Sequence, residues 1–199
     1  VPVDGRCAEG VGDNDTLPAF DGWIAADLLA RAVEGTLRAK EAEEVAASRR
    51  TTLWFNEYGS RYAAIEAACA LFEEIDAYRA QCSAKTTAAE IFDAYCGDWH
   101  RVDAAYRRLV DSMREAGPGF RQAARALTTK ADDAYGKFLV DLADRWQLHL
   151  LDGGAYPPAG VPSQADFFRE HVEKAFPRAE TGKRVGVVVS DAMRYEVGR

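Results

Sequence analysis

Apolar positions recur at steps of three and four along most of the chain, the spacing that places side chains on one face of an α-helix. The clearest stripe advances in strictly alternating steps of three and four from Phe92 to Met113. This heptad spacing predicts a long helical segment with one buried face. Because Gly97 and Asp98 lie off the stripe, we expect either a kink there or two short helices. The stripe consists of Phe92, Tyr95, Trp99, Val102, Tyr106, Leu109 and Met113.

Two helices are predicted nearer the start of the chain. Asp21 is a candidate cap for a helix that continues to Gly35 and carries an apolar stripe. Residues 36–50 are rich in alanine and charged side chains, a composition that favours helix by propensity. This second segment offers only Leu37 and Val45 for burial, so we expect it to be largely exposed.

Two longer helices are predicted on either side of the heptad segment. Residues 53–82 carry an apolar stripe in steps of three and four. The Gly-Pro-Gly sequence at 117–119 ends the heptad segment, and a further helix is predicted over residues 120–151. Together these elements predict a helical bundle or array over residues 20–151. The expected buried faces are Tyr58, Tyr62, Ile65, Cys69, Phe72 and Ile75 in the first helix, and Leu127, Phe138, Leu142, Trp146 and Leu150 in the second.

Glycine and proline mark the expected domain boundaries. Residues 1–19 are rich in Gly, Asp and Pro without a period, and predict an irregular connector. Residues 152–162 combine glycines with prolines, which neither a helix nor a central strand tolerates, so we expect a linker there. Residues 163–199 then begin a second domain. Ser163 opens a capping-box-like sequence, and a short amphipathic helix follows that ends at Pro177. Its apolar side includes Phe167, Phe168, His171, Val172 and Phe176.

Residues 185–189 read VGVVV and predict a buried β-strand, because β-branched side chains fit a pleated surface. A continuous apolar run suits a sheet covered on both faces, as in α/β domains. Asp191 would then stand beyond the carboxyl end of the strand, where ligands bind in open α/β sheets. On position alone, a cap for the following helix is favoured for Asp191 over a metal ligand. One strand cannot form a sheet, so we interpret the chain as a fragment of a longer protein.

Other polar residues near this strand are weaker candidates for chemistry. Ser190 lacks the flanking glycines of a G-x-S-x-G nucleophile elbow. Arg194 and Arg199 are interpreted as solvated helix charges in preference to phosphate ligands.

A mixed cluster of titratable and aromatic residues lies between Asp98 and Arg108. It allows two interpretations: a polar site, or a helix in which Trp99 and Tyr106 are core while the charges face water or a neighbouring domain. The second interpretation is favoured. The three histidines, His100, His149 and His171, are far apart in sequence, lack an H-E-x-x-H pattern and are interpreted as structural.

Composition narrows the class of protein. The chain is 48% hydrophobic and 29% charged, which is typical of globular proteins, and it contains no apolar run of membrane-spanning length. The net charge of −7 argues against a chain-wide nucleic-acid surface. The four cysteines show no CxxC pairing, so we expect reduced thiols and a cytoplasmic location. They are Cys7, Cys69, Cys82 and Cys96.

The string VGVVVSDAMRYEVG resembles the opening of the PglZ domain, in which a hydrophobic run is followed by S-D-A-[LM]-R-Y-E. The matching residues run from Val187 to Glu196. More loosely, the segments FDAYCGDWHRVDAAYRRLV and QADFFREHVEKAF resemble the region that precedes this domain in type A PglZ proteins. The stronger resemblance covers about a dozen residues and the weaker one about half of the chain.

The resemblance implies the fold, a metal site and a biological setting. PglZ domains belong to the alkaline phosphatase superfamily, so the predicted strand would be the first strand of a truncated α/β domain of that kind. Together with the helices predicted above, the expected fold is mainly α: a helical bundle or array followed by this strand. In that superfamily the Asp after the first strand binds a divalent metal, and this role falls on Asp191, with zinc as the expected ion. No catalytic residue is expected within the chain, since the nucleophile and the other ligands would follow Arg199.

Family members are associated with BREX bacteriophage-defence systems. The partners that the resemblance implies are an adenine-specific DNA methyltransferase, a large ATPase and a Lon-like protease, with DNA contacted indirectly and no membrane involved. Two functions therefore remain open: a metal-dependent phosphatase or phosphodiesterase of a defence system, and a helical interaction module of the defence complex without hydrolytic activity.

Overall fold

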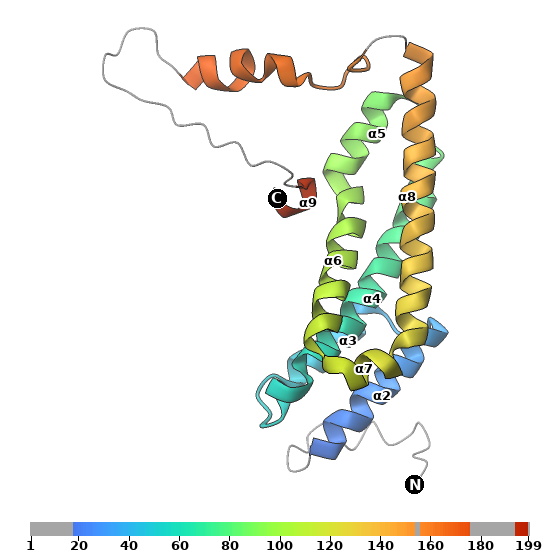
Figure 1. The fold of residues 1–199 in the computed structure, drawn as a ribbon, viewed down its shortest axis with the longest axis vertical. Coiled ribbons are helices and arrows are strands. Elements are labelled where there is room, and N and C mark those ends of the chain that lie inside the picture. The colour runs from blue at the N-terminus through green and yellow to red at the C-terminus, as the bar shows by residue number, and fades with distance from the viewer. Residues whose placement is uncertain (1–17, 154–155, 176–193, 199) are drawn as a thin grey trace, which may run out of the picture.

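The long helix α4, Phe55–Cys82, lies at the centre of the fold and packs against four other helices. The computed structural model describes residues 18–153, 156–175 and 194–198. Within these ranges every regular element is helical, which confirms the expected mainly α architecture (Figure 1). The predicted strand at 185–189 lies outside the described residues, as does Asp191.

Helix α4 is central because it is apolar on several sides. The predicted stripe is confirmed, and Tyr62, Ile65 and Ile75 on it are almost completely buried. The small side chains of Ala64 and Ala68 are also fully buried, which leaves room for neighbouring helices to approach closely. The helices that pack directly against α4 are α2 (Pro18–Glu34), α3 (Ala39–Arg49), α6 (His100–Glu115) and α8 (Arg125–Gly153).

The heptad segment is broken where the glycine predicted a break. Helix α5, Ala88–Ala94, is followed by a π-helical turn, η1, at Tyr95–Trp99 and then by α6. The wider π turn contains Gly97 and Asp98 and keeps Trp99 buried. A capping box begins α5: the amide of Glu90 donates to Thr87 Oγ1 over 3.2 Å, and the amide of Thr87 donates to Glu90 Oε2 over 3.1 Å.

The prediction of one helix over residues 120–151 is wrong. A short helix, α7 at Gly117–Ala123, precedes α8, and Ala124 between them is fully buried. Gly117 has φ of 82°, a left-handed conformation that ends α6, and Pro118 suits the first turn of the next helix. Helix α7 thus carries the chain from the end of α6 to the start of α8 (Figure 1).

The prediction that residues 36–50 are largely exposed, with only Leu37 and Val45 available for burial, is wrong. Leu37 is buried and Val45 is partly buried, but Ala42, Ala46 and Arg49 are buried as well. Arg49 is 1% exposed and pairs with Asp21, which is fully buried. Arg49 donates from Nε to Asp21 Oδ1 over 3.0 Å and from an η nitrogen to Oδ2 over 2.9 Å, while Tyr62 Oη donates to Oδ1 over 2.7 Å. Because α2 begins at Pro18, Asp21 lies inside its first turn and joins α2 to α3 and α4.

The helix predicted after Ser163 is present over residues 164–175 as an unbroken helical segment of mixed type. It consists of 3-10 turns at Gln164–Asp166 (η2) and Glu173–Ala175 (η4) around a π-helical turn at Phe168–Val172 (η3). Ser163 Oγ accepts from the amide of Ala165 over 3.2 Å, but Asp166 pairs with Arg169 instead of completing a capping box. Phe167 and Phe168 are exposed, although Val172 is buried as expected.

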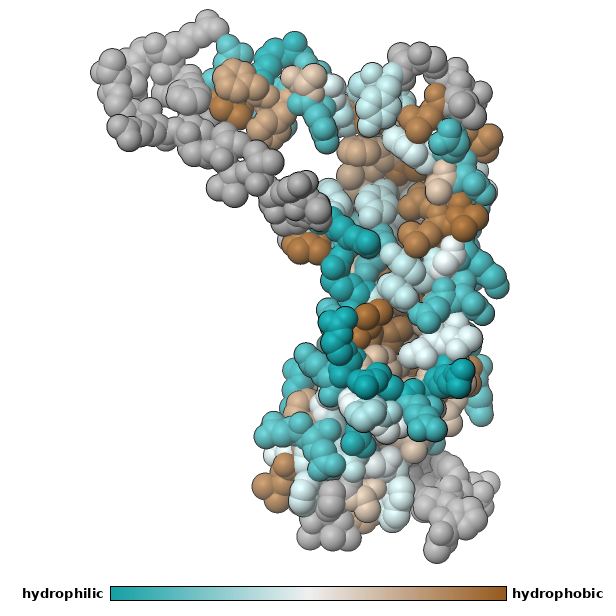
Figure 2. Space-filling view, in the orientation of Figure 1, coloured by the Kyte–Doolittle hydropathy of each residue, from teal (hydrophilic) through white to brown (hydrophobic). Residues whose placement is uncertain are grey.

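Hydrophobic side chains also remain on the surface of the bundle. Figure 2 shows them gathered over the upper part of α8, where Leu139, Val140 and Leu148 are exposed. None of the described helices combines the length and the apolar character required to cross a bilayer.

Candidate functional site

The candidate site is the surface of η1 and α6 on which residues 194–198 lie. Helix α9, Tyr195–Gly198, packs against α6 although about ninety residues separate them in sequence (Figure 1). Tyr195 Oη donates to the carbonyl of Cys96 in η1 over 3.0 Å. The Tyr195 ring meets His100 edge-on at a centroid distance of 5.3 Å and lies 6.0 Å from the ring of Tyr95. We call this surface, with the side chains described below, the α9 seat.

An ion pair attaches the next residue of α9 to the seat. Arg107 of α6 pairs with Glu196, whose side chain is only 2% exposed. A carboxylate that is taken out of water needs a partner of opposite charge, and Arg107 supplies it. The charge of Arg194, just before α9, acts on Tyr135 of α8 and opposes the rise in the pKa of that phenol. Two successive residues, Tyr195 and Glu196, are therefore bonded directly to the bundle.

A buried carboxylate, Asp103, lies beneath the seat. It is 8% exposed, and both of its oxygens accept hydrogen bonds from phenols. Tyr95 Oη donates to Oδ2 over 2.9 Å, and Tyr135 Oη donates to Oδ1 over 2.6 Å. Burial, together with the hydrogen bond and the charge of Asp103, raises the pKa of both tyrosines well above the usual range. Both phenols therefore remain protonated donors at neutral pH.

The position of Tyr135 is fixed from its other side. The ring of Tyr106 stacks on it at a centroid distance of 3.9 Å and an interplanar angle of 10°. Tyr106 Oη in turn donates to Asp132 Oδ1 over 3.0 Å. Contacts within the bundle therefore set the orientations of these side chains, without a contribution from α9.

Both interpretations of the 98–108 cluster hold in part. Trp99 is core, and Arg101 pairs with Asp98 at 3.1 Å on the exposed surface, as the favoured interpretation expects. Asp103 and Arg107, in contrast, belong to the polar surface that holds α9. Sequence reasoning included both residues in the cluster, but it did not identify their partners. The partner Tyr135 comes from another helix, and no local spacing connects it to Asp103.

The residues first singled out for chemistry are not brought together. Asp191 and Ser190 lie outside the described residues. Among the residues that the structure describes, no three His, Cys, Asp or Glu side chains gather where they could hold a metal ion. His100 contacts Tyr195, His171 lies beside Phe167, and His149 is half-buried on α8.

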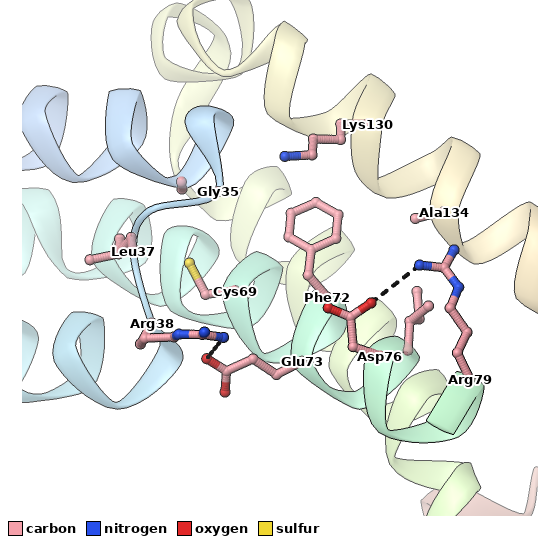
Figure 3. Close-up of a pocket in the computed structure, with 12 residues that line it drawn as sticks. Gly35, Leu37, Arg38, Cys69, Phe72, Glu73, Asp76, Arg79, Lys130 and Ala134 are labelled. Atoms are coloured by element: carbon pink, nitrogen blue, oxygen red, sulfur yellow. Dashed lines mark hydrogen bonds and ion pairs between the residues drawn. The ribbon is translucent and has the colours of Figure 1, made fainter. Parts of the chain in front are cut away.

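Apart from the α9 seat, a recess of about 250 Å³ lies between the α2–α3 loop, α4 and α8 (Figure 3). Its charges are paired: Arg79 bonds to Asp76 at 3.2 Å, and Glu73 lies 3.9 Å from Arg38 and accepts from the first amide of α3. Lys130 Nζ donates to the carbonyl of Val33 over 3.0 Å. These contacts join the elements around the recess, which indicates a structural role.

Cys69 lies in the same recess and is buried. Burial raises the pKa of its thiol to about 11, so the thiol is protonated at neutral pH and is a poor nucleophile. Cys69 and Cys82 are both free thiols, and Cys7 lies outside the described residues.

An apolar groove runs between α5, η1 and α8 and includes Tyr95 in its lining. Its volume is about 360 Å³, and Leu139 on its edge is 42% exposed. The groove is lined by Ile91, Phe92, Tyr95, Leu139, Leu142, Ala143 and Trp146.

Two curated proteins are similar to most of this chain. An alkaline phosphatase-like protein PglZ from Bacillus cereus (strain H3081.97) is 30% identical over 192 residues, which is 94% of this chain and 21% of that protein. An alkaline phosphatase-like protein BrxZ from Escherichia coli O9:H4 (strain HS) is 29% identical over 177 residues, or 82% of this chain and 20% of that protein. The chain thus spans about a fifth of the length of these relatives.

No family model matches the chain, and no solved structure does either. The two relatives nevertheless extend the similarity far beyond the dozen residues of the SDAMRYE string and include the helices that build the α9 seat. Similarity along nearly the whole chain shows that this protein belongs to the PglZ family of alkaline phosphatase-like proteins.

Proposed function

We propose that this chain supports the first catalytic segment of a metal-dependent phosphatase or phosphodiesterase that acts in a BREX-type phage-defence system. The observation that carries the proposal is the attachment of Tyr195 and Glu196 to the bundle. These residues follow Asp191 by four and five positions in the string that resembles the PglZ domain. The bundle is thereby suited to fix the segment that contains Asp191.

In this proposal Asp191 is one ligand of a divalent metal, with zinc as the expected ion. Such a metal polarises a phosphoryl oxygen and activates a nucleophile. One carboxylate does not hold a catalytic metal, because these sites normally use three or more protein ligands. The nucleophile and the other ligands are therefore assigned to the part of the longer relatives that this chain does not cover.

The test is the variant Asp191→Ala in the full-length protein. We expect it to lower the metal content and to reduce the hydrolysis of an aryl phosphate or phosphodiester by at least about 100-fold, since even outer-shell partners of a metal are worth about 10- to 100-fold. Asp93→Ala is the matched control, because Asp93 is an exposed carboxylate on α5. Unchanged metal content and turnover in Asp191→Ala would rule out the metal-ligand role.

A second candidate function is that of a helical interaction module in the same defence complex. The apolar groove between α5 and α8 favours it, because exposed apolar surface of this kind marks contact sites. The proposed occupant is one of the defence proteins: the methyltransferase, the ATPase or the Lon-like protease. A cytoplasmic location and indirect DNA contact belong to this proposal, and the net charge of −7 supports the latter.

Two variants on one helix test the groove. Leu139→Asp places a charge on its edge, and Val140→Asp places the same charge on the neighbouring residue, which does not line the groove and is 62% exposed. With each purified partner, we expect complex formation on a sizing column to be lost in Leu139→Asp and kept in Val140→Asp. Equal behaviour of the two variants would count against the groove as the contact site.

A further inference from the structure

Charged side chains of α6 and charged side chains of the docked segment lie close to one another around α9. Asp103 and Arg107 are four positions apart on α6, a spacing at which an acid and a base commonly pair with each other. Arg107 pairs instead with Glu196, and both oxygens of Asp103 accept from tyrosines. On the docked side, the charge of Arg194 acts on Tyr135, one of these two tyrosines.

Each tyrosine that bonds to Asp103 is also linked to the docked segment. Tyr95 bonds to Asp103 and presents its ring to Tyr195, next to the Cys96 carbonyl that accepts from Tyr195. Tyr135 bonds to Asp103 through its hydroxyl, and the charge of Arg194 acts on it. A buried carboxylate with two fixed donors thus sets the orientation of two aromatic side chains beside the docked segment.

We propose that Asp103 is the positioning residue that seats α9 on the bundle. It acts through Tyr95 and Tyr135, and its negative charge favours the approach of Arg194. Asp103 itself touches neither substrate nor metal in this proposal. Its effect on catalysis rests on the proposed function, since a correctly seated α9 would hold Asp191 in place for metal binding. Its effect on the docking of α9 does not rest on that function.

The first experiment measures docking without reference to activity. In the full-length protein, Asp103→Asn keeps the size of the side chain but removes its charge and replaces one acceptor oxygen with a donor amide. We expect hydrogen exchange at residues 195–198 to become at least about tenfold faster, and trypsin to cleave after Arg194 correspondingly faster. Some loss of melting temperature is expected as well, because Asp103 joins η1 to α8 through two phenols, so exchange in α4 serves as the reference for general destabilisation.

Single hydroxyl deletions separate positioning from general stability. Tyr135→Phe removes the hydroxyl that bonds to Asp103 and should speed exchange at α9 as Asp103→Asn does. Tyr78→Phe is the matched control, because its hydroxyl donates in the same way to a carboxylate of α8, Asp141, and not to Asp103. Exchange at α9 should be unchanged in this control. Equal exchange at α9 in wild type and Asp103→Asn, or an effect of Tyr78→Phe equal to that of Tyr135→Phe, would overturn the proposal.

The second experiment measures metal content and steady-state kinetics of the same variants. Faster exchange at α9 together with weaker metal binding and a lower kcat at similar KM supports both the positioning role and the proposed function. Faster exchange with unchanged metal binding and turnover supports the seat and counts against the role of Asp191. Exchange at α9 that stays near the wild-type rate in Asp103→Glu but becomes fast in Asp103→Gln would further show that α9 requires the negative charge.

Discussion

At the scale of single residues, the buried pair Asp21 and Arg49 stabilises the lower part of the bundle. Burial by itself raises the pKa of Asp21, but hydrogen bonds from Arg49 and Tyr62 and the charge of Arg49 outweigh it and lower the pKa below 3.8. The pair and the phenol connect three helices. Each charge depends on the other, because neither reaches water.

Loss of one partner should be far more damaging than loss of both. Arg49→Met leaves Asp21 buried without a counter-charge, and we expect a loss of about 3–5 kcal/mol in the free energy of unfolding. In Asp21→Asn/Arg49→Met the asparagine oxygen still accepts from Tyr62, so most of this loss should be recovered. Urea unfolding at neutral pH measures both values. A double variant as unstable as Arg49→Met would show that packing by arginine, and not charge pairing, is what matters.

The same pair makes the stability of the protein depend on pH. Because folding lowers the pKa of Asp21, the stability that it contributes is complete above its ordinary value of 3.8. That stability is lost as the pH falls below 3.8 through the folded-state pKa. Wild-type protein should therefore lose stability over this acidic window, and Asp21→Asn/Arg49→Met should lose less. Parallel urea titrations between neutral pH and pH of about 3 compare the two slopes.

At the scale of elements, the capping box of α5 determines where the broken heptad segment begins. Thr87→Ala removes the side-chain acceptor for the amide of Glu90, and helix caps of this type are worth about 1 kcal/mol. We expect a loss of that size in urea unfolding. Thr87→Ser keeps the hydroxyl and is the control, with a loss well below that of alanine. Indistinguishable alanine and serine variants would contradict the capping role.

Element types were predictable from periodicity, but their ends depended on other forces. The stripe from Phe92 to Met113 predicted the buried face of α5, η1 and α6, and Gly97 predicted where the helix changes, although not that the change is a π turn. The separation of α7 from α8 was missed because helix propensity continues through Ala124, while the path from α6 to α8 requires a break there. The burial of Arg49 was missed because its partner Asp21 lies on another helix.

At the scale of the whole molecule, parts of the chain that are far apart in sequence come into contact, and the sequence alone does not say which residues meet. The SDAMRYE string predicted the family and drew attention to Asp191, and the 98–108 cluster contained Asp103 and Arg107. That these two regions touch could not be predicted, because contact across about ninety residues depends on how the helices pack. The docked segment and the seat are the part of the candidate site that required the structure.

The ion pair between Arg107 and Glu196 allows that contact to be tested by exchanging the charges. Arg107→Glu places two carboxylates against each other at a position where the side chain of Glu196 is only 2% exposed, so α9 should leave the seat. Hydrogen exchange at residues 195–198 would then approach the rate of an exposed peptide. In Arg107→Glu/Glu196→Arg the attraction is restored with its direction reversed, and exchange should slow again.

The neighbouring Arg108→Glu provides the control for this exchange of charges. Arg108 pairs with Glu66 of α4 at 2.9 Å, and its own side chain is 58% exposed, so water screens the change and α9 is not involved. Exchange at α9 should remain at the wild-type rate. If Arg108→Glu released α9 as strongly as Arg107→Glu, the effect would come from the general charge of α6. If only Arg107→Glu releases α9 and the double variant restores it, the pair holds the segment after Asp191 directly on the bundle.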